Sequence, residues 1–407
     1  MLMNKNKLAL TVAVAMSLAA PGAFATNGII PLGNGMVAQG VGGAGLSNAG
    51  EASAGMDNPA LISQTGDAFN VAWTMFMPYR EVDTTAVAGT IVESDSNQFA
   101  IPQIALTSKL NDKMNWGILA YAMGGMNTNY RTGMFGGGAP ESANLQGMII
   151  APTISYAFSK DVSAGASLLI GYSTLTGRNL FGSFPVVNNS FDDTSKGFGV
   201  KFGVDAKVAD GISVVAVSLK KKNMDEFGGF KTFLDNFGFT GDAGIPLPDE
   251  AGVGAKFAVG KDLDVVADLL FYKWTSIDVF EFFGWEDQTV LKVGAEWRTS
   301  DKLALRAGLN YGKSPISGGN VTSPIVPFGG VTADAAFANY LFPAISETHF
   351  TLGFGYKMDK SMTVNAYYLY SPETTETATT TSMGLVPPGT TVSMSQHAFG
   401  IGINYRR

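Results

Sequence analysis

The feature that most constrains this chain is a two-residue alternation of apolar with polar or small residues, repeated in fourteen runs after residue 67. In one run, Phe198 and Phe202 alternate with Lys201 and Asp205. Because successive side chains of a strand point to opposite faces, each run predicts a β-strand with one apolar face. Runs of about ten residues have the length of a tilted strand that crosses a bilayer. The runs lie near 68–79, 96–108, 114–124, 146–158, 162–176, 196–208, 212–222, 251–260, 263–275, 288–299, 302–312, 347–358, 361–371 and 395–406.

The connections between these runs alternate in length. Tight polar turns, such as 110–113 and 209–211, alternate with long connections at 80–95, 125–145, 177–195, 223–250, 313–346 and 372–394. Short periplasmic turns and long outer loops are typical of outer-membrane barrels, and a soluble sandwich has no reason to sort its loops in this way. We therefore predict an all-β transmembrane fold, a fourteen-stranded antiparallel outer-membrane β-barrel. Trp73, Trp116, Trp274 and Trp297 lie near strand ends, where we expect them at the bilayer interface.

The N-terminal residues have the pattern of a signal peptide. Lys5 and Lys7 precede an apolar run at 8–20 that is too short to span a bilayer, and Ala-Phe-Ala at 23–25 is a cleavage signal. We assign residues 1–25 to this peptide. The chain has no cysteine, which excludes a lipoprotein anchor and a disulfide scaffold. Its 34 acidic residues outnumber 27 basic ones, which disfavours a nucleic-acid partner.

Residues 26–66 differ from the rest of the chain. They are rich in Gly, Ala, Asn and Ser, and they show neither strand alternation nor a sustained helical stripe. Such a segment cannot bury enough apolar surface to fold alone, so we expect it to lie inside the barrel as a hatch, with 67–407 forming the wall. Gly40, Gly42, Gly43 and Gly45 spell a G-x-G-x-x-G dinucleotide motif, but that interpretation requires a preceding strand and a following helix, which the sequence does not offer.

The order of segments resembles one known family. A signal peptide, a Gly/Ala-rich stretch, the motif Asn58-Pro59-Ala60 and then strands to the end resemble the FadL family of outer-membrane channels for long-chain fatty acids and other hydrophobic compounds. The resemblance covers the whole chain after the signal peptide. It implies that Asn58, Pro59 and Ala60 belong to the hatch, and that uptake of hydrophobic small molecules is passive. It also implies lateral release through a kinked third strand, where Gly124 and Gly125 would permit a bend.

The outer loop 223–250 is rich in phenylalanine. We expect a short helix there, capped by Asn223 with Glu226 three residues later. The loop is either a lid packed on the barrel rim or a hydrophobic landing site for substrate. The resemblance implies the second role for the third and fourth outer loops. The candidate groove residues are Leu180, Phe181, Phe184, Phe227, Phe230, Phe233, Leu234 and Phe237.

Signals of catalysis are weak. The histidines are His349 and His397, and Ser395 beside His397 has no acidic residue nearby to orient the imidazole. We therefore predict no enzyme activity, no catalytic residues, no cofactor and no metal site. Charged residues on the predicted lumen face either pair with one another and hold the hatch, or include a basic group for a substrate carboxylate. Lys292 and Arg306 are the candidates for that second role.

The function that we expect is uptake of fatty acids or hydrocarbons by a monomer surrounded by outer-membrane lipid. Two alternatives remain at this stage: an adhesin or structural barrel that uses its loops for a partner, and a general porin. The sequence leaves fatty acids, alkanes and aromatic hydrocarbons open as substrates.

Overall fold

The computed structural model describes residues 27–85, 89–133, 138–180, 188–316, 320–325, 331–334, 339–377 and 389–407. The predicted signal peptide and the groove residues Phe181 and Phe184 lie outside the described residues.

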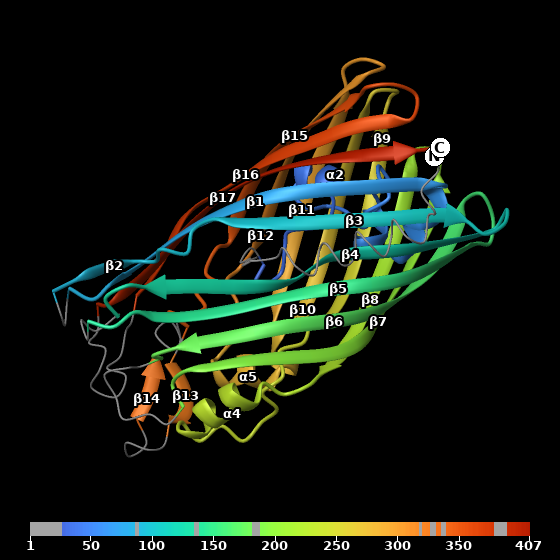
Figure 1. Cartoon of the computed structure of the whole chain (residues 1–407). Coiled ribbons are helices and arrows are strands. Elements are labelled where there is room, and N and C mark those ends of the chain that lie inside the picture. The colour runs from blue at the N-terminus through green and yellow to red at the C-terminus, as the bar shows by residue number, and fades with distance from the viewer. Residues whose placement is uncertain are drawn as a thin grey trace, which may run out of the picture.

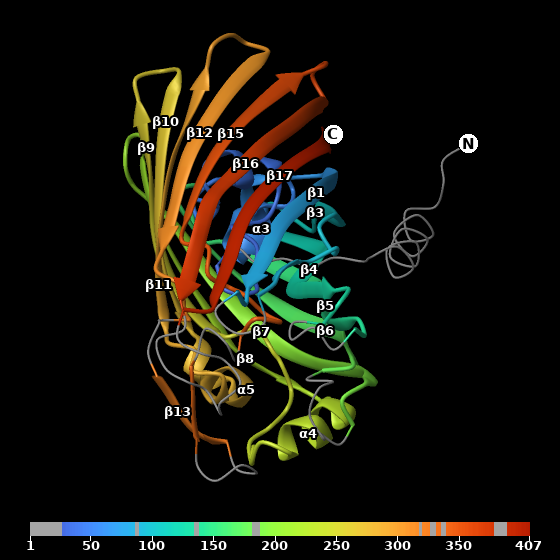
Figure 2. The same cartoon turned by 90° about the vertical axis from the view of Figure 1, so that its left-hand side faces the viewer.

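In the described part of the chain, one antiparallel sheet of fifteen strands curls until β17 pairs with β1 and closes a barrel (Figures 1 and 2). Fourteen strands form the wall, and the short β2 (Ile91–Glu93) pairs with the end of β1. The fourteen predicted strands are therefore confirmed. The wall strands are β1 (Ala68–Asp83), β3 (Phe99–Lys109), β4 (Met114–Tyr130), β5 (Glu141–Ala157), β6 (Val162–Arg178), β7 (Phe191–Ala209), β8 (Ile212–Met224), β9 (Asp249–Val259), β10 (Leu263–Lys273), β11 (Gln288–Arg298), β12 (Leu303–Gly312), β15 (Thr348–Lys357), β16 (Met362–Thr377) and β17 (Thr391–Arg406).

The two ends of the barrel differ. One end carries the tight turns, and the other carries the elements between strands: α4 (Gly228–Asp235), η2 (Trp274–Ser276), α5 (Asp278–Phe282) and the hairpin of β13 (Asn320–Ile325) with β14 (Val331–Asp334) (Figure 1). Tight turns face the periplasm in outer-membrane barrels, so the end with α4 and α5 is the outer mouth. Among the described residues, none of the helices has the length and apolar character needed to cross a bilayer.

The predicted alternation of faces is present in the wall. On β7, Phe198 and Phe202 are 62% and 52% exposed, whereas Lys201 and Asp205 between and beyond them are buried. The apolar side chains therefore face the lipid and the charged ones face the lumen. Lipid contact stabilises the outer face without any need for a packed partner.

Several strands are longer than predicted. β4 was expected to end at Gly124 and β5 to start at residue 146, but pairing continues to Tyr130 and Glu141. The predicted strands are recognised by the alternation of apolar and polar residues. Where a strand projects beyond the bilayer, its outer face does not have to be apolar, so the alternation is lost although the strand continues. The sequence therefore places strand ends too close to the membrane.

Two further predictions were wrong. Trp274 is fully buried and packs against Phe280 and Trp285, so it is not an interface residue; Trp73 and Trp297 are exposed as expected. Asn223 lies within β8 rather than at a helix start. α4 begins later, and the Asp193 carboxylate accepts hydrogen bonds from the backbone N–H groups of Gly229 and Phe230. A side chain distant in sequence thus performs the capping role.

Candidate functional site

Residues 27–66, which we name the inner segment, lie within the barrel. They form α2 (Met36–Gly40), α3 (Ala54–Asp57) and η1 (Pro59–Gln64), and most of their side chains are buried. Figure 2 shows α3 surrounded by wall strands. η1 contacts β5, β6 and β7, while α2 contacts β15 and β16. The inner segment therefore bridges opposite sides of the wall.

Glycines on both sides allow the inner segment to approach the wall backbone. A Cβ atom on Gly308 of β12 would lie 2.1 Å from the Gly42 nitrogen, and one on Gly294 of β11 would lie 2.4 Å from the Val41 carbonyl oxygen. The N–H of Gly42 donates to Thr351 Oγ1 at 2.8 Å. The G-x-G-x-x-G motif at 40–45 thus serves to pack the inner segment against the wall.

The Asn-Pro-Ala motif forms a buried corner. Asn58 has the extended geometry expected before proline, and its Oδ1 accepts a hydrogen bond from the Ala60 N–H at 3.0 Å. Its Nδ2 donates to the carbonyl oxygens of Leu46 at 2.8 Å and of Val204 in β7 at 3.3 Å. One amide side chain therefore ties η1 to another part of the inner segment and to the wall.

A cavity of about 60 Å³ lies between the inner segment and the wall. Around it, Lys201 pairs with Glu250 at 3.3 Å, Lys292 donates to the Leu32 carbonyl oxygen, and Asp268 accepts from the Leu46 N–H at 3.0 Å. This volume is well below the ~150 Å³ of an apolar cavity that admits benzene. This cavity is therefore too small for a molecule of that size.

Two carboxylates of the inner segment are deeply buried. Burial raises the pKa of the Glu51 carboxyl, although that group accepts hydrogen bonds from the Val37 N–H and the Asn70 amide. Burial also raises the pKa of Asp57, against the opposing influence of Lys201 and Lys292. Because burial disfavours their ionised forms, the protonation state of these two carboxyls affects how stably the inner segment packs against the wall.

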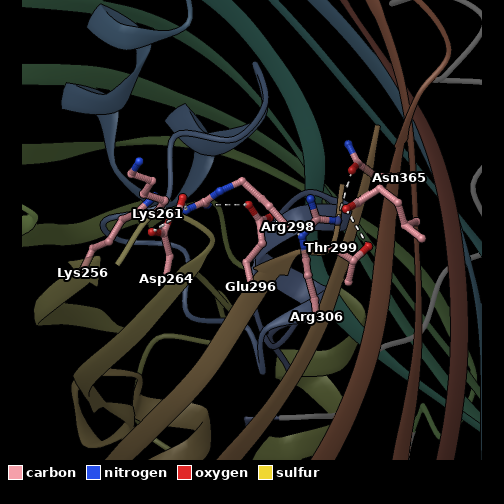
Figure 3. A network of polar contacts seen from close by, with 9 residues as sticks. Lys256, Lys261, Asp264, Glu296, Arg298, Thr299, Arg306 and Asn365 are labelled. Atoms are coloured by element: carbon pink, nitrogen blue, oxygen red, sulfur yellow. Dashed lines mark hydrogen bonds and ion pairs between the residues drawn. The ribbon is translucent and has the colours of Figure 1, made fainter. Parts of the chain in front are cut away.

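A second polar network joins β9, β10, β11, β12 and β16 (Figure 3). Asp264 pairs with Lys256 and with Arg298, each at 2.8 Å. Arg306 donates to Glu296 at 2.6 Å and to Asn365 at 3.1 Å. Lys292 and Arg306, the predicted carboxylate binders, are thus both engaged by protein groups.

β4 is irregular where a bend was expected. Its register shifts between Ala122 and Gly124, and Gly124 has φ 146°, but the strand continues beyond this point. A Cβ atom on Gly124 would lie 2.4 Å from the Ile29 carbonyl oxygen, which accepts a hydrogen bond from the Gly125 N–H at 3.0 Å. The inner segment therefore contacts the wall at this bulge.

The phenylalanines of the outer loop are packed together. Phe230 and Phe233 of α4 each contact Phe191 of β7, with ring centroids 5.6 and 6.2 Å apart, and Phe233 contacts Phe237 at 5.3 Å. The described members of the predicted groove are all buried: Leu180, Phe227, Phe230, Phe233, Leu234 and Phe237. In this structure they form an aromatic cap on the rim.

Residues 339–346, which we name the outer strap, bind to opposite sides of the mouth. Asn339 accepts a hydrogen bond from the Trp285 indole, next to β11, at 2.7 Å. Across the barrel, Tyr130 of β4 donates to the Tyr340 carbonyl oxygen at 2.9 Å, and the Tyr340 hydroxyl contacts Glu141 of β5. The sequence predicts this stretch only as part of the long connection 313–346. The consecutive apolar residues Tyr340, Leu341 and Phe342 could have indicated that this stretch packs on the barrel, because an outer loop has no reason to expose such residues to water.

Comparisons with known proteins agree with this architecture. The profile of the family described as "Outer membrane protein transport protein (OMPP1/FadL/TodX)" matches residues 12–189 and 192–407. The fold is similar to that of the Pseudomonas putida toluene transporter TodX, with a TM-score of 0.69 and 16% identity over 92% of this chain and 99% of that one. It is also similar to the Ralstonia pickettii toluene transporter TbuX, with a TM-score of 0.63 and 16% identity over 92% and 98%.

A Pseudomonas aeruginosa FadL homologue gives a TM-score of 0.65 and 15% identity over 94% of this chain and 100% of that one. At such identities the structural likeness establishes the fold alone. No curated protein sequence gives a significant match. The family profile covers nearly the whole chain, including the strands that build the lumen, so the chain belongs to the OMPP1/FadL/TodX family of outer-membrane transport proteins.

Proposed function

We propose that this protein is a channel for passive uptake of hydrophobic small molecules, long-chain fatty acids or hydrocarbons, across the outer membrane. The observation that supports the proposal is the packing inside the barrel: a glycine-rich inner segment is seated on the wall by Gly42, Gly308 and Asn58. A general porin requires an open polar passage, which this packing opposes. The inner segment, together with Thr26, acts in our proposal as a movable hatch.

The proposed route begins at the outer loops. The cap residues, with Phe181 and Phe184, capture substrate when the cap opens, and the outer strap then admits it to the lumen. Displacement of the inner segment enlarges the cavity next to Lys292. The bulge at Gly124, where the wall touches Ile29, is the proposed place of lateral release.

Lys292 and Arg306 remain candidates for binding a substrate carboxylate. Each would have to exchange a present partner, the Leu32 carbonyl oxygen for Lys292 and Glu296 for Arg306. Movement of the inner segment would release Lys292, so we propose that this lysine becomes available only when the hatch shifts.

Growth and uptake experiments test the proposal. A strain lacking this protein, and the same strain complemented with it, are supplied with oleate, hexadecane or toluene as the carbon source, and uptake of each labelled compound is measured. Toluene is included because two of the structurally similar proteins are toluene transporters. We expect complementation to restore uptake of at least one compound. Equal uptake of all three with and without the protein would reject the proposed function.

A further inference from the structure

The basic side chains that face the lumen differ in how their charge is balanced. Among the described residues, Lys201, Lys256, Arg298 and Arg306 each form an ion pair with a carboxylate. Lys292 lies in the field of Asp57 and Asp268. These cations are compensated within the protein. Among the described side chains, Arg80 of β1 is the exception.

Arg80 is 1% exposed and has few polar partners. Its Nη2 donates to Ser94 Oγ at 3.4 Å, its Nε has no partner among the described residues, and its guanidinium lies over the Phe99 ring at 5.9 Å. Tyr130 interacts electrostatically with Arg80, and Glu141 interacts with Tyr130.

No carboxylate among the described side chains pairs with Arg80. The internal segments outside the described residues contain no Asp or Glu in their sequence, and Asp334 is the one acidic residue after residue 26 whose side chain is not described. A buried charge without a counter-ion is strongly unfavourable, and a cation–π contact offsets only part of that cost. Natural proteins retain such unfavourable groups chiefly at functional sites.

The surroundings of Arg80 indicate which ligand it would take. The unpaired Nε and the weakly bound Nη2 form one edge of the guanidinium, and this edge matches the two oxygens of a carboxylate. Below it, Phe99 and Phe76 belong to an apolar cluster that continues to Leu32 and Met36 of the inner segment. Above it, Tyr130 is bonded to the outer strap. Arg80 thus lies between the mouth and an apolar region.

We propose that Arg80 is the headgroup subsite for a carboxylate-bearing amphiphile whose apolar tail lies along Phe99 and Phe76. This inference rests on the proposed uptake function and assigns to it an anionic substrate class. The subsite is distinct from Lys292 and Arg306, since it lies under the outer strap and needs no ion pair to be broken. It would hold the carboxylate before the hatch moves.

The test compares two ligands that share a tail. Binding of dodecanoate and of 1-dodecanol to the purified full-length protein is measured in nonionic detergent at a pH where dodecanoate is ionised. Arg80→Met keeps the side-chain stem and removes the charge. We expect the dissociation constant for dodecanoate to rise about tenfold or more and that for dodecanol to change by less than about twofold. The control Arg131→Met removes an exposed arginine at the same mouth and should change neither.

A second variant supplies the missing counter-ion from within. Ser94→Asp places a carboxylate beside Nη2, and we expect it to raise the unfolding temperature while weakening dodecanoate binding. This variant keeps the test decisive if Arg80→Met fails to fold. Unchanged dodecanoate affinity in a folded variant, or an equal loss for both ligands, would overturn the subsite. Parent protein that binds dodecanol but not dodecanoate would overturn the subsite alone, whereas failure to bind either ligand would overturn the proposed function with it.

Discussion

Replacement of Asn58 by alanine should release the inner segment from the wall while leaving the barrel intact. The Asn58 side chain accepts one hydrogen bond from Ala60 and donates two, to Leu46 and to Val204, and it is fully buried. Alanine leaves these three backbone groups without their partner. Wall strands keep their own ladder, so the loss falls on the docking of the inner segment.

The magnitude follows from those three contacts. A buried polar group that loses its partner costs about 1–3 kcal/mol, so the docked state should lose about 3 kcal/mol or more. This corresponds to a rise on the order of 100-fold in the population of the undocked segment. Asn58→Asp preserves the acceptor for Ala60 but places an oxygen against the carbonyls of Leu46 and Val204, so it should be at least as disruptive.

Hydrogen exchange of the purified protein measures this population directly. Protection of residues 27–66 should fall by the factor above in both variants, while protection of wall strands such as β10 should not change. Asn115→Ala is a suitable control, because it truncates another buried lumen amide whose nitrogen has no partner among the described residues. Uptake of hydrophobic substrate should fall in the Asn58 variants before heat-modifiable gel mobility is lost. If the inner segment keeps its protection, or if the wall loses protection equally, the corner is part of the barrel fold and the docking argument is refuted.

Three other predictions address the hatch, the cap and the charge of the inner segment. Deletion of residues 30–55 should leave an inserted barrel with greater permeability to small polar solutes in liposome swelling; a barrel as impermeable as the parent would show that the segment is not the plug. Changing Phe227, Phe233 and Phe237 together to Ser should slow substrate capture, since each buried Phe contributes about 2 kcal/mol of apolar contact, and unchanged capture would reduce the cap to a simple lid. Because burial raises the pKa of Asp57, its contribution to docking is present below about pH 4 and is lost as pH rises through that raised value. Protection factors of the inner segment should therefore fall with rising pH in the parent, and Asp57→Asn should weaken this dependence.

Much of the wall could be predicted because strand polarity is local. The face that Phe198 or Lys201 presents depends on its position in a period of two, and the lipid imposes that period along every strand. The same reasoning failed at Trp274, whose position near a strand end resembles an interface site. Its indole instead packs with Phe280 and Trp285 and donates to Gln288, a set of contacts that only the folded outer mouth creates.

The sequence by itself determined the strand count, the sorting of turns and loops, and the unusual character of residues 26–66, because each depends on composition or on spacing between near neighbours. The tertiary structure decided which residues meet inside the lumen. Gly42 meets Gly308 and Thr351, and Tyr340 meets Tyr130, although Gly42 and Thr351 lie 309 positions apart and Tyr130 and Tyr340 lie 210 positions apart in the sequence. Arg80 gives the same lesson about charge. Its sequence neighbours include Glu81, yet strand alternation turns that carboxylate to the other face, and the buried guanidinium has no carboxylate partner among the described side chains.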